Sequence, residues 1–290
     1  MSKLRSALAI SYPALKIFRK LRCLSSVGDS KHLRVLLYHD IQPEEYTSFQ
    51  LQLEWMSHRW AFISPDDFSE IIKGNTTIKT DSLLLTFDDG FASNRRIVEK
   101  ILNPIGIKAL FFIVSDFANI EEKEEARQFI IRHIQPGRSR DDLPQDLTNM
   151  GWSDLEALLE YGHTIGAHTR THARLSGINS SDRLSYEIVS SADQLEKRLG
   201  VGIEHFAYTF GDLTSFSRQA LQVAQQRFQF IHSGLRGNNV GGSPSFVIRR
   251  DALKPTDPNA LVGAFLEGGA DFIYRRSLDR LGLWSEKPNC

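Results

Sequence analysis

Cysteine and long hydrophobic runs are scarce in this sequence, and both absences narrow the choice of fold. The two cysteines, Cys23 and Cys290, lie near opposite ends of the 290 residues, so neither a disulfide framework nor a Cys-x-x-Cys metal site is expected. No apolar run approaches the roughly 20 residues of a membrane-spanning helix, so no transmembrane segment is predicted.

The sequence also lacks a net charge. Lys plus Arg and Asp plus Glu each number 35, which gives no general attraction to nucleic acid, and we expect no nucleic-acid partner. Hydrophobic residues make up 41% of the chain, which is enough for a sizeable core in one large domain or two small ones.

Residues 1–30 differ from the rest because they combine basic and apolar side chains. Lys3 and Arg5 precede a short apolar stretch, as in a signal peptide, but Pro13 and further basic residues interrupt it, which fits a cleaved signal poorly. We predict a basic amphipathic arm whose residues 1–27 contact a membrane peripherally, with a loosely packed arm as the alternative. Without a clear export signal, a cytoplasmic location is expected, at or near the membrane surface.

Beyond residue 30, segments with strand character alternate with segments of helical spacing. The expected strands are 33–38, 83–87, 107–114, 163–167 and 205–210, with late strands marked by Phe230, Phe246 and Ile248. The expected helices are 47–56, 94–102, 182–199, 218–228, 259–266 and one opened by a capping box at Ser153–Glu156. This alternation predicts a parallel sheet, open or closed into a barrel. Residues 120–148 break the pattern and are interpreted as an insertion over one face, either a lid or substrate rim or a solvated excursion.

Two short motifs carry the candidate chemistry. Strand 83–87 leads into two adjacent carboxylates, Asp88 and Asp89, and like charges so close together are costly unless a cation lies beside them. His168 and His172 are four residues apart, a spacing that puts both imidazoles on one side of a helical turn. Each motif alone is common in turns and on surfaces, but together they indicate one site. We interpret Asp89, His168 and His172 as ligands of a divalent metal, with Asp88 placed to take a proton from a metal-bound water.

The same motifs resemble those of a known family. TFDDG (86–90), HTRTH (168–172) and FAYTFGD (206–212) follow the order and spacing of motifs in the polysaccharide deacetylases of carbohydrate esterase family 4, which share the NodB homology domain. VLLYHD (35–40) resembles the first strand of bacterial members linked to exopolysaccharide, and the resemblance covers roughly residues 33–250. It implies that residues beyond the arm, 31–290, form a catalytic domain with a distorted, incomplete (β/α)7 barrel.

The resemblance also implies a reaction. Asp88 is the catalytic base, and Asp89, His168 and His172 bind a divalent metal, usually zinc and sometimes cobalt or nickel. Water attacks the acetamide carbonyl of an N-acetylated sugar, and a histidine protonates the leaving amine. The expected substrate is a polysaccharide or glycolipid that carries N-acetyl groups, with O-acetyl groups as the less favoured choice.

The sequence departs from the family in its third motif, which usually reads Arg-x-Pro-x-Gly. Ala207 stands at the arginine position, whose guanidinium orients the base in the family, and Thr209 stands at the proline position. Arg249 or Arg170 is the candidate replacement for that guanidinium, and a surface salt bridge is the alternative role of Arg249. The residues assigned to substrate binding are Tyr208, Phe210, Gly211 and Arg249.

The family's C-terminal Leu-x-x-His motif, the source of the general acid, is missing, since no histidine follows His232. His39 ends the first strand and is the favoured replacement, because some relatives with this strand have the motif moved to the front. His232 is the second candidate. A hydrogen-bonded structural role is the alternative for both histidines.

Two other functions remain compatible with these residues. The altered third motif and the missing last histidine also fit a non-catalytic carbohydrate-binding protein on a decayed deacetylase fold, which would bind glycan without releasing acetate. The same metal chemistry fits an amidohydrolase that acts on a non-sugar amide. Measured acetate release would distinguish a deacetylase from the carbohydrate-binding protein. The range of substrates that react would distinguish a deacetylase from the amidohydrolase.

Overall fold

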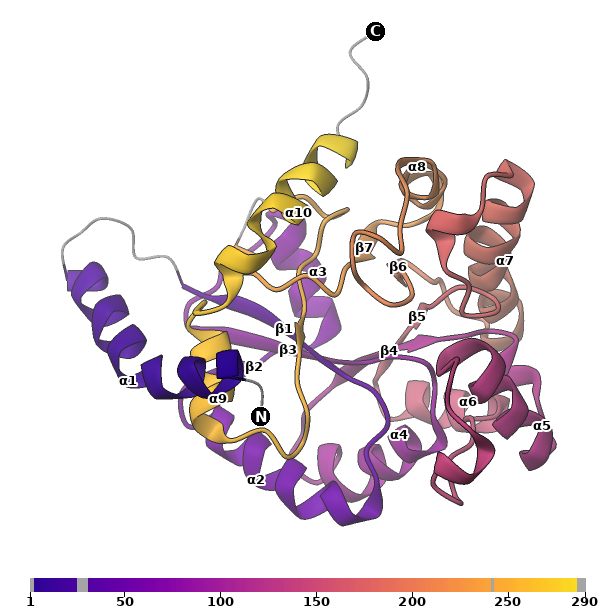
Figure 1. Ribbon diagram of the computed structural model, residues 1–290, viewed down its shortest axis with the longest axis horizontal. Helices are drawn as coiled ribbons and strands as arrows, with labels where there is room; N and C mark the ends of the chain where they lie inside the picture. Colours follow the sequence, from indigo (N-terminus) through magenta and orange to yellow (C-terminus); the bar gives the residue numbers. More distant parts are fainter. Residues whose placement is uncertain (1–2, 25–30, 241–242, 286–290) are drawn as a thin grey trace, which may run out of the picture.

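The fold is built on a curled sheet of parallel strands whose outer face is covered by helices (Figure 1). The computed structural model describes residues 3–24, 31–240 and 243–285, so residues 1–2 and 25–30 of the predicted arm lie outside the described residues. The strands are β1 (Leu33–Tyr38), β2 (Ala61–Phe62), β3 (Ser82–Phe87), β4 (Ala109–Ile113), β5 (Thr164–Ala167), β6 (His205–Ala207), β7 (Phe230–His232) and β8 (Asp251–Ala252). The helices are α1 (Lys3–Leu24), α2 (Tyr46–Ser57), α3 (Pro65–Lys73), α4 (Ala92–Ile97), α5 (Lys123–Phe129), α6 (Trp152–Glu160), α7 (Ser181–Leu199), α8 (Arg218–Arg227), α9 (Asn259–Leu266) and α10 (Asp271–Ser285).

The strand order is β7-β6-β5-β4-β3-β1-β8, and the short β2 also pairs with β3. Each of these pairings is parallel. Residues 245–252 run from one edge of the sheet to the other, because Ile248 hydrogen-bonds to Ile231 of β7 while β8 pairs with β1. This arrangement confirms the predicted incomplete (β/α)7 barrel.

Alternation along the strands decides which side chains reach the inside of the curl. Leu84 of β3 and Val35 of β1 belong to the apolar cluster inside the curl, whereas Leu85 packs in the cluster under the helices. Because successive side chains in a strand point to opposite faces, Asp88 follows Leu84 inward and His39 follows Val35 inward. The two strands that carry these residues are direct neighbours, so both side chains arrive at the same end of the barrel.

Helix α3 fills the inside of the curl beneath that end. Its residues Phe68, Ile71 and Ile72 are buried in the same cluster as Leu84 and Val35. The helix begins at the N-cap Ser64, whose side chain accepts a hydrogen bond from the Asp67 amide, and its C-cap is Gly74 with φ of 81°. The site above it therefore has a well-packed floor.

Most predicted elements are confirmed with small shifts at their ends, and strand 33–38 and helix 259–266 match β1 and α9. The capping box at Ser153 is wrong, since α6 has Gly151 as its N-cap and the Asp154 carboxylate accepts from the Gly151 amide. Helix α10 was not predicted.

Two strand predictions near the site are also wrong. β6 ends at Ala207, because the chain turns away soon afterwards and reaches Phe210 with φ of 63°. Phe246 and Ile248 do not form a strand, although Ile248 makes an isolated bridge to His232. The pairing with β1 comes later, at β8.

The insertion at residues 120–148 is structured and has an apolar cluster of its own. α5 continues into a π-helical segment, Ile130–Ile134. Ile130 and Ile134 are buried together with Phe91, which follows β3, and Val114, which follows β4. The insertion is therefore anchored beside the carboxyl ends of the strands, where a substrate rim would lie.

Helix α1 packs along α9, so the alternative of a loosely packed arm does not describe residues 3–24. Leu8 is buried, and the Tyr12 ring lies so close to α9 that a Cβ at Gly263 would be 2.4 Å from it. None of the helices within the described ranges has both the length and the hydropathy needed to cross a membrane.

Candidate metal and active site

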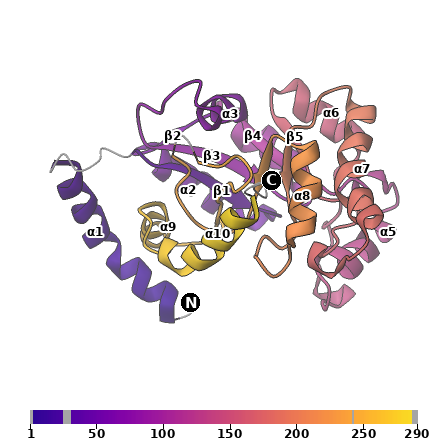
Figure 2. The same ribbon diagram turned by 90° about the horizontal axis from the view of Figure 1, so that it is seen from above.

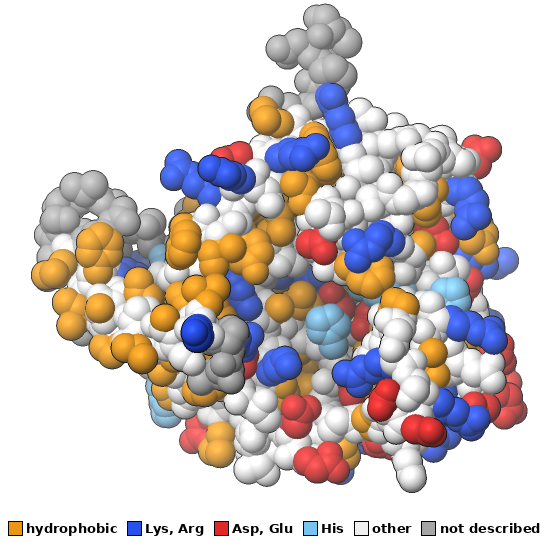
Figure 3. Space-filling model, in the orientation of Figure 1, with side chains coloured by type: hydrophobic (Ala, Val, Ile, Leu, Met, Phe, Trp, Pro, Cys, Tyr) orange, Lys and Arg blue, Asp and Glu red, His pale blue; other side chains and the backbone are white. Residues whose placement is uncertain are grey.

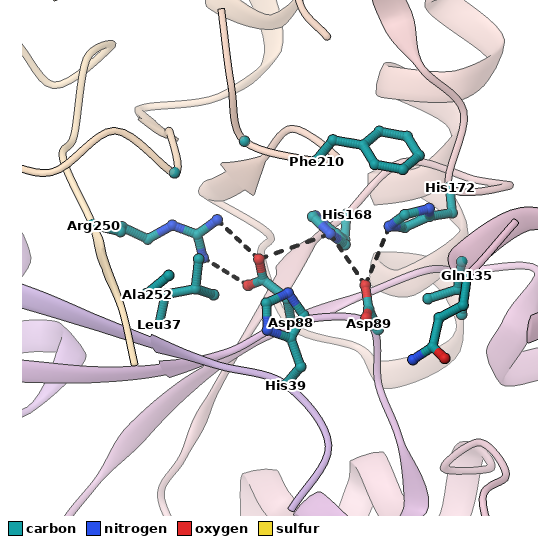
Figure 4. A pocket seen from close by; sticks show the side chains of 13 residues that line it. Leu37, His39, Asp88, Asp89, Gln135, His168, His172, Phe210, Arg250 and Ala252 are labelled. Carbon is teal, nitrogen blue, oxygen red and sulfur yellow. Dashed lines mark hydrogen bonds and ion pairs between the residues drawn. The ribbon is translucent and has the colours of Figure 1, made fainter. Parts of the chain in front are cut away.

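A cavity of about 330 Å³ opens at the carboxyl ends of the strands and contains most of the residues that the sequence motifs single out (Figure 4). It is lined by Leu37, His39, Asp88, Asp89, Ile134, Gln135, His168, His172, Phe210, Gly211, Gly234, Arg250 and Ala252. Ligand sites of parallel α/β folds concentrate at this edge. The two predicted motifs thus converge on one cavity.

The three predicted metal ligands lie together. The Asp89 Oδ1 is 3.4 Å from the His168 Nε2 and 3.3 Å from the His172 Nε2. All three residues are buried, and their ligand atoms lie within 4.8 Å of one another. The structure therefore brings the Asp-His-His group together as the sequence predicted.

Both imidazoles are oriented by backbone carbonyls. The His168 Nδ1 is 2.7 Å from the Ala207 carbonyl oxygen, and the His172 Nδ1 is 2.9 Å from the His133 carbonyl oxygen. A carbonyl can only accept, so each Nδ1 carries the proton and each Nε2 presents a lone pair toward Asp89. This is the usual support of a histidine that binds a metal.

The histidine motif is not helical, contrary to the expectation from its spacing of four. It is a loop after β5 that a buried carboxylate, Glu187 of α7, holds in place. Glu187 accepts from the backbone amides of Arg170 and Thr171 and from the Thr171 hydroxyl, at 2.8–3.2 Å. Tertiary hydrogen bonds, not helical geometry, therefore bring the imidazoles together.

Backbone strain gathers around the cavity. Within the described ranges, the non-glycine residues with positive φ are Asp89, Thr169, His172 and Phe210, with φ between 61° and 77°. Three of them line the cavity, and Thr169 directly follows His168. Such residues cost roughly 1–3 kcal/mol each and persist where the surroundings hold them for function.

The trio fits a metal ion. Ligand atoms bound at about 2.0–2.1 Å to a tetrahedral ion lie about 3.3–3.4 Å apart, which agrees with the separations from Asp89 Oδ1 to the two Nε2 atoms. The Asp89 Oδ1 is buried without a hydrogen-bond partner among the described residues. A buried, unpaired carboxylate oxygen facing two lone pairs is what a divalent ion would satisfy.

Asp88 is paired with an arginine that the sequence analysis did not single out. The Arg250 guanidinium donates to both Asp88 carboxylate oxygens, at 2.6 and 2.9 Å, and to the Ser233 carbonyl at 2.8 Å. Arg250 is fully buried, and Asp88 is 3% exposed. The two-point contact fixes the plane of the carboxylate and leaves it 3.9 Å from the His168 Nε2, across the cavity from Arg250 (Figure 4).

A second buried ion pair holds the segment that carries Arg250. Arg34 of β1 donates to both carboxylate oxygens of Asp251, at 2.8 and 2.7 Å, and Arg236 donates to the same carboxylate at 3.2 Å. Because Asp251 directly follows Arg250, this network fixes residues 250–251 between the two edges of the sheet. The guanidinium therefore reaches Asp88 from a rigid support.

The predicted replacements for the family arginine lie elsewhere. Arg249 donates to the Asn238 carbonyl and is not among the residues that line the cavity. Arg170 pairs with Asp116 at 2.9 Å, on the loop between the two histidines. The guanidinium at Asp88 belongs to Arg250 instead.

The third motif is split between the cavity and the core. Phe210 and Gly211 line the cavity, and the Phe210 ring is 40% exposed. Gly211 has φ of 70°, and a Cβ there would lie 2.8 Å from the backbone of Gly234, so only glycine fits. Tyr208 is buried outside the cavity lining and stacks on Phe216 with ring centroids 4.1 Å apart.

The two candidate histidines for the general acid have different surroundings. His39 is exposed and lines the cavity, where its imidazole lies beside Asp88 (Figure 4). His232 is buried beneath the cavity floor, with its Nε2 3.1 Å from the His205 Nδ1 and its ring against Phe112. Burial lowers the pKa of His232 well below its usual value.

Sequence reasoning missed Arg250, Gln135 and Glu187. Arg250 carried a weak signal, because it stands next to Arg249 in an apolar segment. Gln135 lines the cavity from the insertion, and its Oε1 is buried without a partner among the described residues. No local pattern marks Gln135 or Glu187, since their roles arise only from tertiary packing.

The sequence matches a family model and several solved structures. The model for polysaccharide deacetylase matches residues 75–228, more than half of the chain. No curated protein matches the sequence.

Solved structures share the fold at low sequence identity. IcaB from Ammonifex degensii is 20% identical, with a TM-score of 0.64 over 82% of this chain and 97% of that one. The Streptococcus pyogenes deacetylase PplD, solved with acetate, is 19% identical, with a TM-score of 0.63 over 80% of this chain and 97% of that one. A de-N-acetylase from Aggregatibacter actinomycetemcomitans is 16% identical, with a TM-score of 0.62 over 81% of this chain and 100% of that one. These likenesses support the incomplete barrel.

Proposed function

The chain belongs to the polysaccharide deacetylase family, hydrolases that act on carbon–nitrogen bonds, and we propose that it removes N-acetyl groups from sugars of a polysaccharide or glycolipid with one divalent metal ion. The observation that carries this proposal is the pairing of two differently held carboxylates. Asp89 faces two imidazole lone pairs, and Asp88 is fixed by Arg250 beside them. One carboxylate is arranged to bind metal and the other to accept a proton.

In the proposed reaction, the oxygen of a water molecule bonds to the acetamide carbonyl carbon while Asp88 takes a proton from that water. Arg250 keeps the acceptor oxygen of Asp88 aimed at that water. A divalent metal held by Asp89, His168 and His172 supplies Lewis-acid stabilisation of the oxygen charge that develops. His39 donates a proton to the leaving nitrogen as the carbon–nitrogen bond breaks, which gives acetate and a free amino sugar.

Zinc is the metal we propose, with cobalt or nickel as alternatives. Two neutral imidazoles and one carboxylate suit zinc, and three protein ligands leave a position open for water or substrate. The ligand separations given above fit bonds of zinc length. The same ligands bind Co²⁺ and Ni²⁺, so availability decides among the three.

Phe210 and Gln135 are proposed to contact the sugar. Phe210 presents an exposed ring at the cavity, and aromatic rings stack on the apolar faces of sugars. The unpaired Gln135 Oε1 offers an acceptor for a hydroxyl or amide N–H group. Gly211 lets the chain approach closely at the same wall, and a sugar-binding role for Arg249 or Tyr208 would need the substrate to extend beyond the cavity.

These contacts remove the main support for the non-catalytic alternative. It was motivated by the missing arginine of the third motif and the missing last histidine. Arg250 supplies a guanidinium to Asp88, and His39 supplies an imidazole to the same cavity. The alternative of a non-sugar amide substrate has no feature of its own that favours it.

We expect the zinc-loaded protein to release acetate from N-acetylglucosamine oligomers, and a chelator such as dipicolinate to reduce the rate to background. Added Zn²⁺ or Co²⁺ should restore it. Acetate is measured by a coupled assay and the free amine by fluorescamine labelling. Acetate release that is unaffected by complete metal removal, or no release from any acetylated glycan, would contradict the proposal.

Replacing the two candidate acids should separate their roles. His39→Gln is expected to lower kcat by about 10²–10⁴-fold with little change in KM, because proton transfer to the leaving amine is lost while binding remains. His232→Gln should change the melting temperature more than kcat, because it lies in the core. Equal kcat values for wild type and His39→Gln would show that another group protonates the amine.

A further inference from the structure

Among the α1 side chains that the structure describes, residues 3–19 and 21, those that are exposed are apolar except Lys3. The large ones include Ile10, which is 80% exposed, and Phe18, which is 61% exposed. The exposed residues among these side chains are Leu4, Ala7, Ile10, Pro13, Ala14, Ile17, Phe18 and Leu21, together with Lys3 at the beginning of the helix. We name this set the α1 apolar face. A helix on the surface of a soluble domain normally turns such a face inward.

Two arginines of α1 pair with carboxylates of the body and tie the helix to it. Arg5 pairs with Asp257, and Arg19 pairs with both Asp81 and Glu267, the latter at 3.0 Å. Leu8 is buried on the same side. The helix is therefore held in this orientation by ion pairs as well as by packing, and the apolar side is left outside.

Helix α10 extends this surface. Phe272 and Leu283 of α10 are 71% and 65% exposed, and Arg275 and Arg276 are exposed beside them in the sequence. Figure 2 places α1, α9 and α10 along the same edge of the molecule, and Figure 3 shows apolar side chains over α1 and α10 with basic side chains among them. Large contiguous apolar areas of this kind mark interaction sites.

We propose that the α1 apolar face and the outer side of α10 dock on an anionic lipid surface. Lys3 is exposed beside the apolar side chains of α1, which has no Asp or Glu, and Arg275 and Arg276 are exposed on α10, so these cations can meet acidic headgroups while the apolar side chains enter the interface. A second copy of the chain is a poorer occupant. A symmetric contact would bring two α1 apolar faces together, each with an exposed Lys3 and with no Asp or Glu on either helix to pair with it.

Docking in this orientation turns the cavity toward the lipid. The face of the molecule in Figure 3 that carries the apolar side chains is also hollowed at its centre, where a histidine lies beside acidic side chains. Resting on the proposed deacetylase function, this placement favours an acetylated sugar carried on a lipid over a sugar polymer free in solution. The lipid anchor would hold the sugar near the cavity and raise its local concentration.

The test is co-sedimentation of the full chain with vesicles. Binding is expected to an equimolar mixture of phosphatidylcholine and phosphatidylglycerol, and it should weaken in high salt and with phosphatidylcholine alone. The variant Ile10→Asp/Ile17→Asp should lower the bound-to-free ratio at least about tenfold, because two charges then replace apolar insertion. Val201→Asp, an exposed apolar position after α7, is the matched control and should bind as wild type does.

Circular dichroism spectra and melting curves of the variants should match those of the wild type, because both isoleucines are exposed and their replacement should not unfold the chain. Absence of vesicle binding by the wild type would overturn the proposal. So would equal binding of wild type and Ile10→Asp/Ile17→Asp, or a dimer in analytical ultracentrifugation that only this variant disrupts. Acetate release from a soluble oligomer should be the same for both proteins, so a failed deacetylase assay would leave the vesicle result to decide this inference on its own.

Discussion

Asp88→Asn is expected to abolish measurable acetate release while the protein keeps its metal. Asparagine has the shape of aspartate and retains one oxygen that accepts from Arg250, but its amide does not accept a proton from water at neutral pH. Loss of a general base typically costs 10²–10⁴-fold, and we expect a loss of about 1,000-fold or more in kcat. The metal should stay because Asp89, His168 and His172 are untouched.

The measurement pairs initial rates with metal content by inductively coupled plasma mass spectrometry. Asp146→Asn is the matched control, because that carboxylate makes only a partly exposed ion pair with Arg96, at 3.1 Å. A variant at Asp88 that retains a tenth or more of wild-type kcat would remove Asp88 from the base role. A variant that loses its metal would show that Asp88 also belongs to the metal site.

Arg250 replacement is expected to have the second largest effect, and it acts on both stability and rate. Arg250→Met leaves the buried Asp88 carboxylate without its partner, and breaking a buried ion pair from one side costs about 3–5 kcal/mol of folding free energy. Arg250→Lys keeps a charge but cannot make the two-point contact, so we expect kcat to fall about 10–100-fold with KM nearly unchanged. Chemical denaturation measures the first effect and steady-state kinetics the second.

If Arg250 positions Asp88 for the reaction, we expect one further result that a purely structural role would not give. Added guanidinium ions should partly restore kcat of a truncated variant such as Arg250→Ala under conditions where its melting curve shows it folded. Arg249→Met is the informative neighbour. If Arg249 binds substrate, KM should rise in this variant, whereas the contact of its guanidinium with Asn238 leads us to expect wild-type kcat. Equal losses of kcat at both arginines would argue against a specific role for Arg250.

The convergence of Asp89, His168 and His172 was predictable from the sequence, because Asp89 and His168 lie just after strands and His172 lies in the loop after β5. Leu84 and Leu85 mark a buried strand, parallel strands place their carboxyl ends at one edge, and Asp89 and His168 both follow such strands. The same reasoning placed His39 at the cavity. That prediction needed only local information, namely where a strand lies, where it ends and which residue type follows it.

The arginine and the shape of the histidine loop could not be predicted in this way. Arg250 reaches Asp88 because residues 245–252 cross between two sheet edges, and the Asp251–Arg34 pair fixes that crossing over a separation of 217 residues. The spacing of His168 and His172 suggested a helical turn, but Glu187, on a helix later in the chain, selects a different backbone. Contacts between residues so far apart in the sequence produce no periodic pattern from which they could be predicted.

The acceptor for the His172 Nδ1 proton is the carbonyl of His133, which belongs to the insertion and not to the barrel. Which nitrogen of this ring carries the proton is therefore decided by a segment that also contributes Ile134 and Gln135 to the cavity wall. Shortening or shifting this segment would remove the His133 carbonyl and allow the other tautomer of the ring. A change in the part of the wall that contacts the sugar would therefore also change the affinity for the ion. Grafting another relative's rim onto this barrel would have to carry an equivalent carbonyl with it.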